Sequence, residues 1–163
     1  MDEETWSGWM REYGPPLLRY CHHILGDYHA AQDGVQETFL KAWERRDKFT
    51  PGTNASAWLY RIAYTTCVDE LRRRKRLLFL PAPEPVRDPD YLGPALRGAL
   101  DRLTTQERAL VYSRVMEERD YKELEQIYNV PAATLRKRYE RAKRKLADAL
   151  TEGRTALQKE ELL

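Results

Sequence analysis

Three side chains that commonly bind metals, His29, Asp33 and Glu37, recur at four-residue intervals and would share one helical face. Such a stripe could in principle hold a metal ion or serve an enzyme. The rest of the sequence offers no glycine-rich phosphate loop and no nucleophile with a plausible base. The adjacent His22 and His23 are expected to place one ring inward and one in solvent. We therefore predict no metal, no cofactor and no catalytic residue.

The basic residues offer a different chemistry, the binding of a polyanion. Five consecutive basic residues run from Arg72 to Arg76, and seven Lys or Arg against one acid, Glu140, lie between Arg136 and Lys145. One such run usually marks a solvated helix face. Two runs, each closing or forming an amphipathic helix, favour a polyanionic partner. The net charge of +2 hides this uneven distribution.

Length and composition indicate a protein with packed cores. The 163 residues suffice for one domain or two small ones, and 42% of them are hydrophobic. No apolar run approaches the roughly 18 residues of a membrane span, and the N-terminal "MDEETWSGWM" is acidic, unlike a signal peptide. Cys21 and Cys67 lie far apart among apolar neighbours and are predicted to be buried free thiols. These features predict a cytoplasmic protein without membrane insertion.

The N-terminal half has helical periodicity and no convincing strand. Apolar residues recur at helical spacing up to Leu25, and the segment Gly14–Pro16 indicates a bend in this helix. Asp27 can cap a second helix, and the segment Thr50–Asn54 breaks the chain. A third helix from about Ser56 ends in the first basic run. Three helices of this length predict a small bundle.

A proline-rich segment, Pro81–Pro94, predicts an extended connector between two domains, because it contains five of the nine prolines. The fold class predicted is all-α, with two small helical domains joined by this linker. The expected boundaries are 1–78 for the first domain, 79–95 for the linker, 96–150 for the second domain and 151–163 for a tail.

The second domain has the pattern of a helix-turn-helix. Thr104 and Glu107 have capping-box spacing, and the motif Asp120–Glu123 resembles a second cap over a short helix ending at Tyr128. Asn129 tolerates left-handed geometry and is expected in the turn. A basic helix then runs to about Leu150. In this pattern the second helix enters the major groove of DNA.

Two segments resemble the domains of one bacterial family, the extracytoplasmic-function (ECF, group four) sigma factors of the sigma-70 family. The first segment, Asp33–Arg76, resembles the sigma-two domain, and Ala99–Leu150 resembles the sigma-four domain. The first resemblance is carried by Asp33, Val35-Gln36-Glu37-Thr38-Phe39, Ala42-Trp43, Phe49, the run from Trp58 to Ala63, Asp69 and the basic tail. The order and spacing of both segments follow the family.

The resemblance implies a transcription initiation factor that binds core RNA polymerase, recognises a two-part promoter and helps to melt its minus-ten element. It implies contacts with the clamp helices of the largest polymerase subunit and the flap of the second largest. The clamp-facing residues would be Asp33, Gln36, Glu37 and Lys41, which share one helical face. A solvated polar face is the alternative. An anti-sigma partner is common in the family, although no residue here indicates one.

The resemblance also implies which residues bind promoter DNA. The segment Asp47–Asn54 would capture an unstacked base, the next helix would read melted bases, and the basic run would bind phosphates. The residues expected at the minus-ten element are Lys48, Thr50, Thr53, Asn54, Arg61, Tyr64, Thr65, Arg72, Arg73, Arg74, Lys75 and Arg76. Those expected at the minus-thirty-five element are Thr134, Arg136, Lys137, Arg138, Glu140, Arg141 and Arg144.

Several positions depart from the family pattern. Thr65 stands where asparagine is common, and Gly34 replaces a usual leucine at a cost in helix propensity of about 1 kcal/mol relative to alanine. The helix-turn-helix departures are Glu125, at a usually small position, Asn129, where glycine is usual, and Lys137 and Glu140 on the recognition helix. Unusual minus-thirty-five recognition is therefore expected.

Two other functions remain open from the sequence alone. The chain could be a DNA-binding regulator that uses only the C-terminal helix-turn-helix and acts without core polymerase. It could also be an enzyme built on His29, Asp33 and Glu37. The regulator hypothesis leaves the match of Ala30–Arg76 unexplained, and the enzyme hypothesis lacks a second group of catalytic residues.

Overall fold

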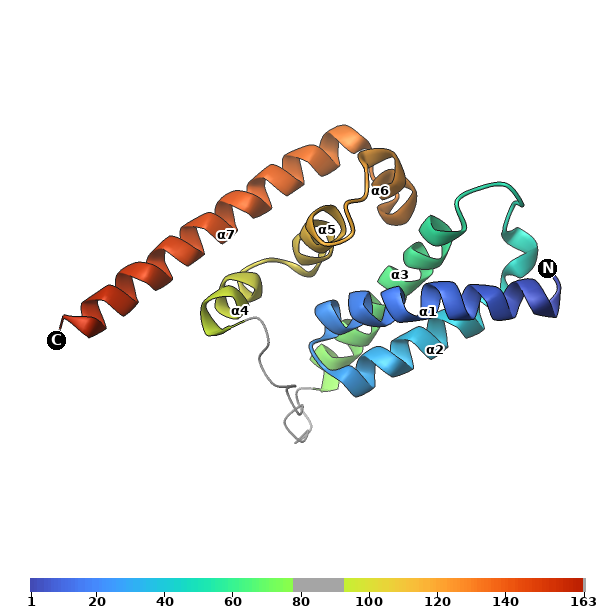
Figure 1. Cartoon of the computed structure of the whole chain (residues 1–163), viewed down its shortest axis with the longest axis horizontal. Coiled ribbons are helices and arrows are strands. Elements are labelled where there is room, and N and C mark those ends of the chain that lie inside the picture. The colour runs from blue at the N-terminus through green and yellow to red at the C-terminus, as the bar shows by residue number, and fades with distance from the viewer. Residues whose placement is uncertain (78–92, 163) are drawn as a thin grey trace.

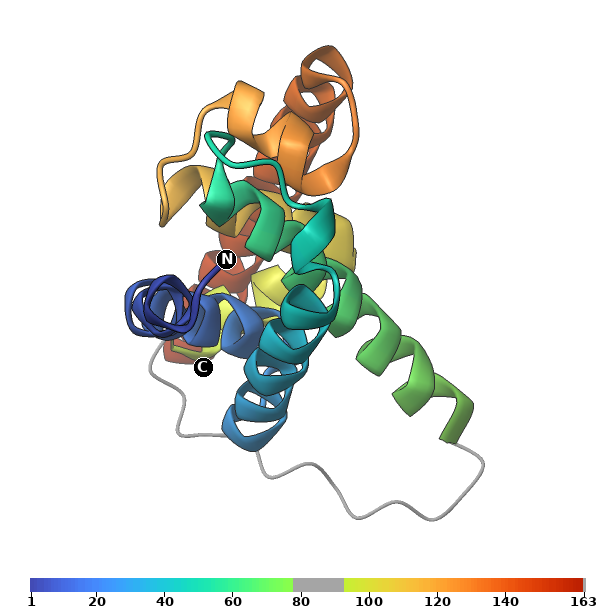
Figure 2. The same ribbon diagram turned by 90° about the vertical axis from the view of Figure 1, so that its right-hand side faces the viewer.

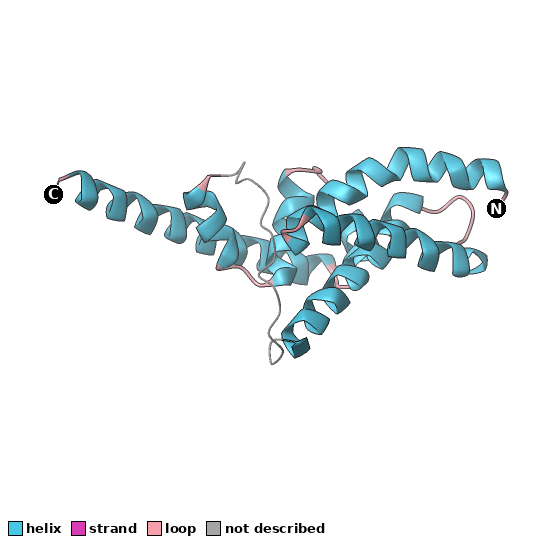
Figure 3. Ribbon diagram, turned by 90° about the horizontal axis from the view of Figure 1, so that it is seen from below, coloured by secondary structure: helices cyan, strands magenta, loops and turns pink. Residues whose placement is uncertain are grey.

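A computed structural model describes residues 1–77 and 93–162 of the chain. These residues form seven α-helices and one short 3₁₀-helix, and no strand occurs among them (Figure 3). The all-α fold expected from the sequence is therefore confirmed. Most of the predicted linker, 79–95, lies outside the described residues.

The first helical unit contains α1 (Glu3–Leu25), α2 (Tyr28–Glu44) and α3 (Ala55–Arg76), with the 3₁₀-helix η1 at Arg46–Lys48 (Figure 1). Asp27 caps α2 as predicted, because its side chain accepts hydrogen bonds from the amides of His29 and Ala30. Helix α1 is continuous through Pro15 and Pro16, where the sequence indicates a bend.

The interior of this unit is formed by residues from all three helices. Its fully buried side chains include Leu17, Tyr20, Cys21, Leu59 and Cys67. Both cysteines are free and buried, which confirms the prediction. A hydrogen bond with Cys67 and burial both raise the pKa of the Cys21 thiol far above its usual range. This thiol therefore stays protonated at neutral pH and packs as a small apolar group.

Gly34 lies in this interior because α2 approaches α1 closely at that point. A β-carbon added to Gly34 would lie 3.6 Å from Leu25 Cδ1 and 3.8 Å from Cys21 Sγ, which are ordinary contact distances. The space suits one methyl group, and a leucine would have to displace Leu25 or Cys21.

We expect Gly34→Ala to raise the free energy of unfolding by about 0.5–1 kcal/mol, because alanine restricts the unfolded chain and favours the helix. Gly34→Leu should lower it by about 1–3 kcal/mol through overpacking. Urea denaturation of the two variants beside the wild type measures both effects. Destabilisation by alanine would show that the close approach of α1 and α2 tolerates no side chain.

The second helical unit contains α4 (Pro94–Asp101), α5 (Thr105–Val115), α6 (Tyr121–Tyr128) and α7 (Ala132–Glu161). The capping box is present: Thr104 accepts from the Glu107 amide at 3.2 Å, and Glu107 accepts from the Thr104 amide at 3.0 Å. Asp120 caps α6, and Asn129 ends it in the left-handed conformation, with φ of 54°. The helix-turn-helix elements thus form where the sequence predicts them.

Two features of this unit differ from expectation. Helix α4 was not predicted, and α7 continues to Glu161 although its end was expected near Leu150. The continuation beyond Leu150 contains good helix formers and a single glycine. Packing adds support, since α4 contacts α7 and Arg102 Nη1 lies 2.6 Å from Glu152 Oε2. Because α7 extends away from the other helices, the two termini lie at opposite ends of the molecule (Figure 1).

The two units pack directly against each other. Helix α6 lies on α3, and α5 contacts α1 (Figures 1 and 2). One hydrophobic cluster runs through both units, from Leu17 and Leu59 to Leu110, Leu124 and Ile127. Within the described residues, no helix is both long enough and apolar enough to cross a membrane.

Candidate polymerase and nucleic-acid interfaces

The predicted clamp-facing residues lie on the outer ridge of α2. Asp33, Gln36 and Glu37 are exposed, as expected for a binding surface. Lys41 is half-buried, because its ammonium group donates to the Thr66 hydroxyl of α3 at 3.1 Å. Lys41 also lies 3.9 Å from Glu37. The ridge therefore offers two exposed carboxylates and an amide, and Lys41 anchors α2 to α3.

Hollows flank this ridge on both sides. Between α1 and α2 lies an apolar groove of about 1000 Å³, lined by Trp6, Met10, Leu18, Val35, Gln36, Phe39, Leu40 and Trp43 among others. Leu40 and Trp43 are 59% and 37% exposed, which is unusual for large apolar side chains on one surface. A polar pocket between α2 and α3 contains Asp33, Glu37 and Lys41. Such a mixture of apolar and charged surface suits a helical protein partner.

The loop between η1 and α3 contains the residues expected to capture a base. Lys48, Thr50 and Thr53 are exposed there, and Thr53 Oγ1 donates to the Thr50 carbonyl at 2.6 Å. Asn54 has a structural task as well: its side-chain oxygen accepts from the Ala57 amide at 3.0 Å and caps α3.

The structure separates the three residues expected to read melted bases on α3. Arg61 and Thr65 are exposed, and the Thr65 hydroxyl donates to the Ile62 carbonyl at 2.9 Å. Tyr64 is half-buried, because its ring meets the ring of Tyr128 edge-on at 4.9 Å. In this arrangement Tyr64 faces α6 of the second unit.

The basic run at the end of α3 also divides into two groups. Arg73 pairs with Glu70 at 2.8 Å, and Arg74 contacts Glu70 and donates to the Leu25 carbonyl at 3.1 Å. The remaining members, Arg72, Lys75 and Arg76, are exposed. Arg74 therefore ties α3 to the end of α1, whereas the exposed cations are available to phosphates.

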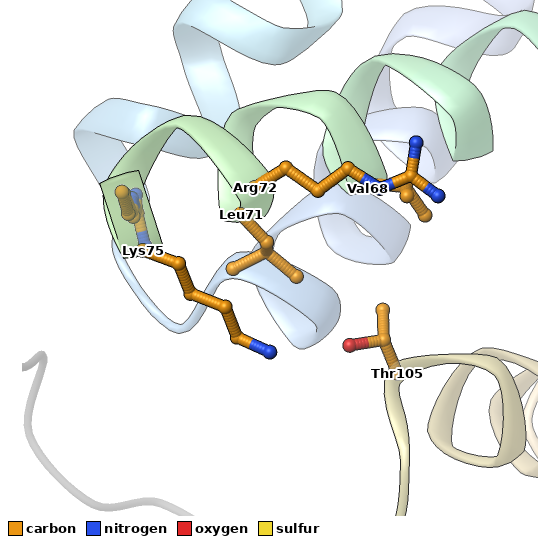
Figure 4. Close-up of a pocket in the computed structure, with 6 residues that line it drawn as sticks. Val68, Leu71, Arg72, Lys75 and Thr105 are labelled. Atoms are coloured by element: carbon orange, nitrogen blue, oxygen red, sulfur yellow. The ribbon is translucent and has the colours of Figure 1, made fainter. Parts of the chain in front are cut away.

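A pocket of about 350 Å³ lies between this basic run and the start of α5. Figure 4 shows the side chains of Leu71, Lys75 and Thr105 directed into it, with Arg72 along its edge. The pocket brings the basic run of the first unit beside the second unit.

The recognition helix exposes most of its predicted residues. Arg136, Lys137, Glu140, Arg141 and Arg144 are exposed. The other two predicted residues, Thr134 and Arg138, are half-buried, and Arg138 Nη1 lies 3.3 Å from Gln106 Oε1. The guanidinium of Arg136 stacks over Tyr121 at 4.8 Å, and Glu140 pairs with Lys143 at 3.3 Å.

Glu125 has a clear structural role. Pro131 stands at the N-cap of α7 and provides no side-chain hydrogen bond. Glu125 supplies one from α6 instead, since its carboxylate accepts from the Ala132 amide at 2.5 Å. The unusual glutamate thus caps the recognition helix from outside.

Sequence reasoning missed the residues that join the two units. The Tyr60 hydroxyl donates to Glu117 Oε2 at 2.5 Å, and Arg119 donates to Ser56 Oγ at 2.9 Å. No local pattern identifies these residues, because each pair is separated by more than fifty positions and depends on how α6 packs on α3.

His23 also lies at the contact between the units, where its ring stacks on Tyr112 at 4.6 Å. Its Nε2 is buried without a hydrogen-bond partner. Burial, with the nearby charges of Arg108 and His22, lowers the pKa of His23 from 6.5 to about 4. Protonation therefore favours the unfolded chain, whose histidine keeps the ordinary value.

We expect the contribution of His23 to stability to be complete above pH 6.5 and to be lost as the pH falls towards about 4. Thermal unfolding between pH 7.5 and pH 4.5 should therefore show a smaller decrease for His23→Gln than for the wild type. The exposed His29, changed to Gln, is the control and should follow the wild type. Parallel curves for all three proteins would contradict the assignment.

The structure brings together no group of three or more metal-binding side chains within its described residues. His29, Asp33 and Glu37, which share one face of α2, therefore do not form such a group. Asp33 and Glu37 lie on the outer ridge of α2.

Family comparisons match both halves of the chain. The family model for Sigma-70 region 2 matches residues 9–77, and the model for Sigma-70, region 4 matches residues 94–146. The ECF RNA polymerase sigma factor SigE of Mycolicibacterium smegmatis is 31% identical over 159 residues, covering 90% of this chain and 62% of SigE. SigW of Bacillus subtilis, another ECF RNA polymerase sigma factor, is 24% identical, covering 91% of this chain and 90% of SigW. The chain thus spans less than two thirds of the SigE length.

Two solved structures have a similar fold. The sigma factor RpoE, in complex with the anti-sigma factor NepR from Bartonella quintana, matches with a TM-score of 0.76 and 22% identity, covering 91% of this chain and 98% of RpoE. CnrH, in complex with the cytosolic domain of CnrY, matches with a TM-score of 0.72 and 22% identity, covering 93% and 90%.

Proposed function

Because the chain belongs to the ECF sigma factors of the sigma-70 family, we propose that it is a transcription initiation factor that directs core RNA polymerase to promoters. The observation that carries this proposal is the presence of both sigma-70 regions in one chain, in family order. A regulator that needs only a helix-turn-helix would not require the first unit.

The first unit would bind polymerase through the ridge of α2. The exposed Asp33 and Glu37 supply charge, and the neighbouring groove supplies apolar area for a helical partner such as the clamp helices. The second unit would contact the flap. Residues 1–78 and 96–150 would then be the two functional domains, joined by 79–95.

Promoter DNA would be held at two places. The loop before α3, together with Arg61, Tyr64 and Thr65, would take up the melted minus-ten strand, and the exposed cations that end α3 would bind its phosphates. The exposed face of α7 would enter the major groove at the minus-thirty-five element. The protein would perform no chemistry itself and would act in the cytoplasm.

An anti-sigma factor is a further proposed partner. The support is the shared fold: the similar structure of RpoE is a complex with the anti-sigma factor NepR, and that of CnrH is a complex with the cytosolic domain of CnrY.

Run-off transcription with core RNA polymerase and a library of randomised promoters tests the function. We expect transcripts from templates that share two motifs, one near minus ten and one near minus thirty-five. Core polymerase without the chain is the control. Absence of chain-dependent transcripts, with retained binding to duplex DNA, would favour the regulator that acts without polymerase.

A further inference from the structure

Helix α6 holds the first turns of the recognition helix α7 at two points. Residues 129–131 join the two helices, which pack against each other (Figure 1). Glu125 accepts a hydrogen bond from the amide of Ala132, the first residue of α7. One turn earlier on α6, the Tyr121 ring lies 4.8 Å from the guanidinium carbon of Arg136, one turn later on α7. Residues four apart share a helical face, so the two contacts link one face of α6 to one face of α7.

The Tyr121 ring is itself held in place. It is half-buried and packs against the hydrophobic cluster that runs through both helical units. A second guanidinium, that of Arg114 on α5, lies over the same ring at 4.7 Å. Arg114 also donates from Nη1 to the Arg119 carbonyl at 2.6 Å. Tyr121 therefore presents a fixed aromatic surface to Arg136.

The contact with Tyr121 leaves the hydrogen-bond donors of Arg136 available. A cation is attracted to the face of an aromatic ring by the quadrupole of that ring, so the contact does not consume an N–H group. Arg136 is exposed, and no other described residue forms a hydrogen bond or an ion pair with it. Its planar fork of N–H groups can therefore donate to a base edge, as arginine does to O6 and N7 of guanine.

The other charged residues of the recognition helix are held differently. Arg138 spends a donor on Gln106 at 3.3 Å, and Glu140 pairs with Lys143 at 3.3 Å. Among the predicted minus-thirty-five residues that the structure describes, Arg136 alone lies over an aromatic ring. It also lies near the start of α7, and the N-terminal residues of a recognition helix are those that contact base edges.

An ordered arginine gains more at a base than at a phosphate. A long side chain loses rotational freedom when it binds, and a side chain that is already ordered in the free protein avoids most of that loss. Pairing with guanine requires two N–H groups in the plane of the base, whereas a phosphate accepts from many directions. Ordering of Arg136 should therefore strengthen base preference more than general affinity for DNA.

We propose that Tyr121 is a positioning residue for promoter recognition, whose ring holds the Arg136 guanidinium in the orientation that donates to a guanine of the minus-thirty-five element. The proposal deepens the proposed function and rests on it. Glu125 supports the same arrangement, because its bond to the Ala132 amide fixes the first turn of α7 against α6.

The test measures base preference in run-off transcription by the full chain with core RNA polymerase. Templates selected from the promoter library are varied at one base pair of the minus-thirty-five element at a time, and Arg136→Ala identifies the base pair that this arginine recognises. Tyr121→Phe keeps the ring, whereas Tyr121→Leu and Tyr121→Met replace it with apolar chains that still pack on the cluster. Lys122→Gln, at an exposed position of α6, is the control. Thermal melting verifies that each variant is folded.

We expect Tyr121→Leu and Tyr121→Met to lower the preference for guanine at that base pair about two- to fivefold. Preference at the other base pairs should stay unchanged. Tyr121→Phe and Lys122→Gln should match the wild type. In a chain that already carries Arg136→Ala, Tyr121→Leu should have no further effect on preference, because both residues act through one contact.

A wild-type preference in the folded Leu and Met variants of Tyr121 would overturn the proposal, even where transcription supports the proposed function. A loss that is equal at every base pair, or that adds to the loss from Arg136→Ala, would overturn it by assigning Tyr121 to the stability of the helix-turn-helix. A stronger guanine preference without the ring would do so by showing that Tyr121 withholds Arg136 from DNA. If the library yields no promoter, the proposed function fails and the positioning role with it.

Discussion

A chain carrying Asp33→Lys and Glu37→Lys is expected to lose at least about 100-fold in affinity for core RNA polymerase while keeping its fold. Both carboxylates are exposed on α2, beside the apolar groove. Reversing two charges at the centre of a complementary interface places like charges together, which costs several kcal/mol. Stability should change by less than about 1 kcal/mol, because the substituted side chains are exposed and the Glu37–Lys41 pair, at 3.9 Å, is weak.

A matched control separates a local effect from a change in net charge. Asp148→Lys with Glu160→Lys makes the same charge change at exposed positions of α7. Equilibrium binding to labelled core polymerase and thermal melting are measured for both double variants. An equal loss of binding in the control would point to net charge, and an equal loss of melting temperature in the α2 variant would make these carboxylates structural.

The helices that the sequence predicts best are those with strong local signals. Asp27, Thr104 and Asp120 each cap a helix where a short polar side chain precedes a periodic apolar segment. Asn129 takes the left-handed conformation expected of it. Such features depend on a few neighbouring residues, so they can be read without the tertiary structure.

The elements that the sequence did not predict depend on packing between distant segments. Helix α4 is only eight residues long and follows the proline-rich segment, so its local signal is weak. The end of α7 is supported by Arg102, fifty residues before its partner Glu152. The contacts of Tyr60 with Glu117 and of Ser56 with Arg119 join α3 to a turn of the second unit that no periodicity identifies.

The candidate site also combines features that the sequence predicts with features that depend on packing between distant segments. A run of five basic residues looks uniform in sequence, but the structure gives its members different partners. Arg74 donates to the carbonyl of Leu25 at the end of α1, whereas the side chains of Arg72 and Lys75 are exposed. Likewise, the sequence shows Glu125 only as a large residue at a usually small position, whereas the structure shows that its carboxylate accepts a hydrogen bond from the Ala132 amide.

The exposed members of the basic run are expected to have a large effect on promoter binding. Changing Arg72 and Lys75 to alanine should weaken promoter binding for all sequences alike, because these exposed side chains would contact phosphates and not bases. Each lost phosphate contact lowers the slope of log affinity against log salt by about 0.7 to 0.9, so the double variant should lose about 1.4 to 1.8. Between 50 and 200 mM salt, its affinity should therefore fall about tenfold less than that of the wild type.

Arg74→Ala is the informative comparison, since it removes one charge from the same run. Its guanidinium donates to the Leu25 carbonyl at 3.1 Å and pairs with Glu70 at 3.4 Å, so its loss should lower the free energy of unfolding by about 1 kcal/mol. Its salt slope should stay near that of the wild type. Fluorescence anisotropy across a salt series, with urea denaturation of each protein, measures both quantities. A wild-type slope in the Arg72 and Lys75 variant would mean that this part of the run is a solvated helix end, and the phosphate contacts would then have to lie elsewhere on α3 or its preceding loop.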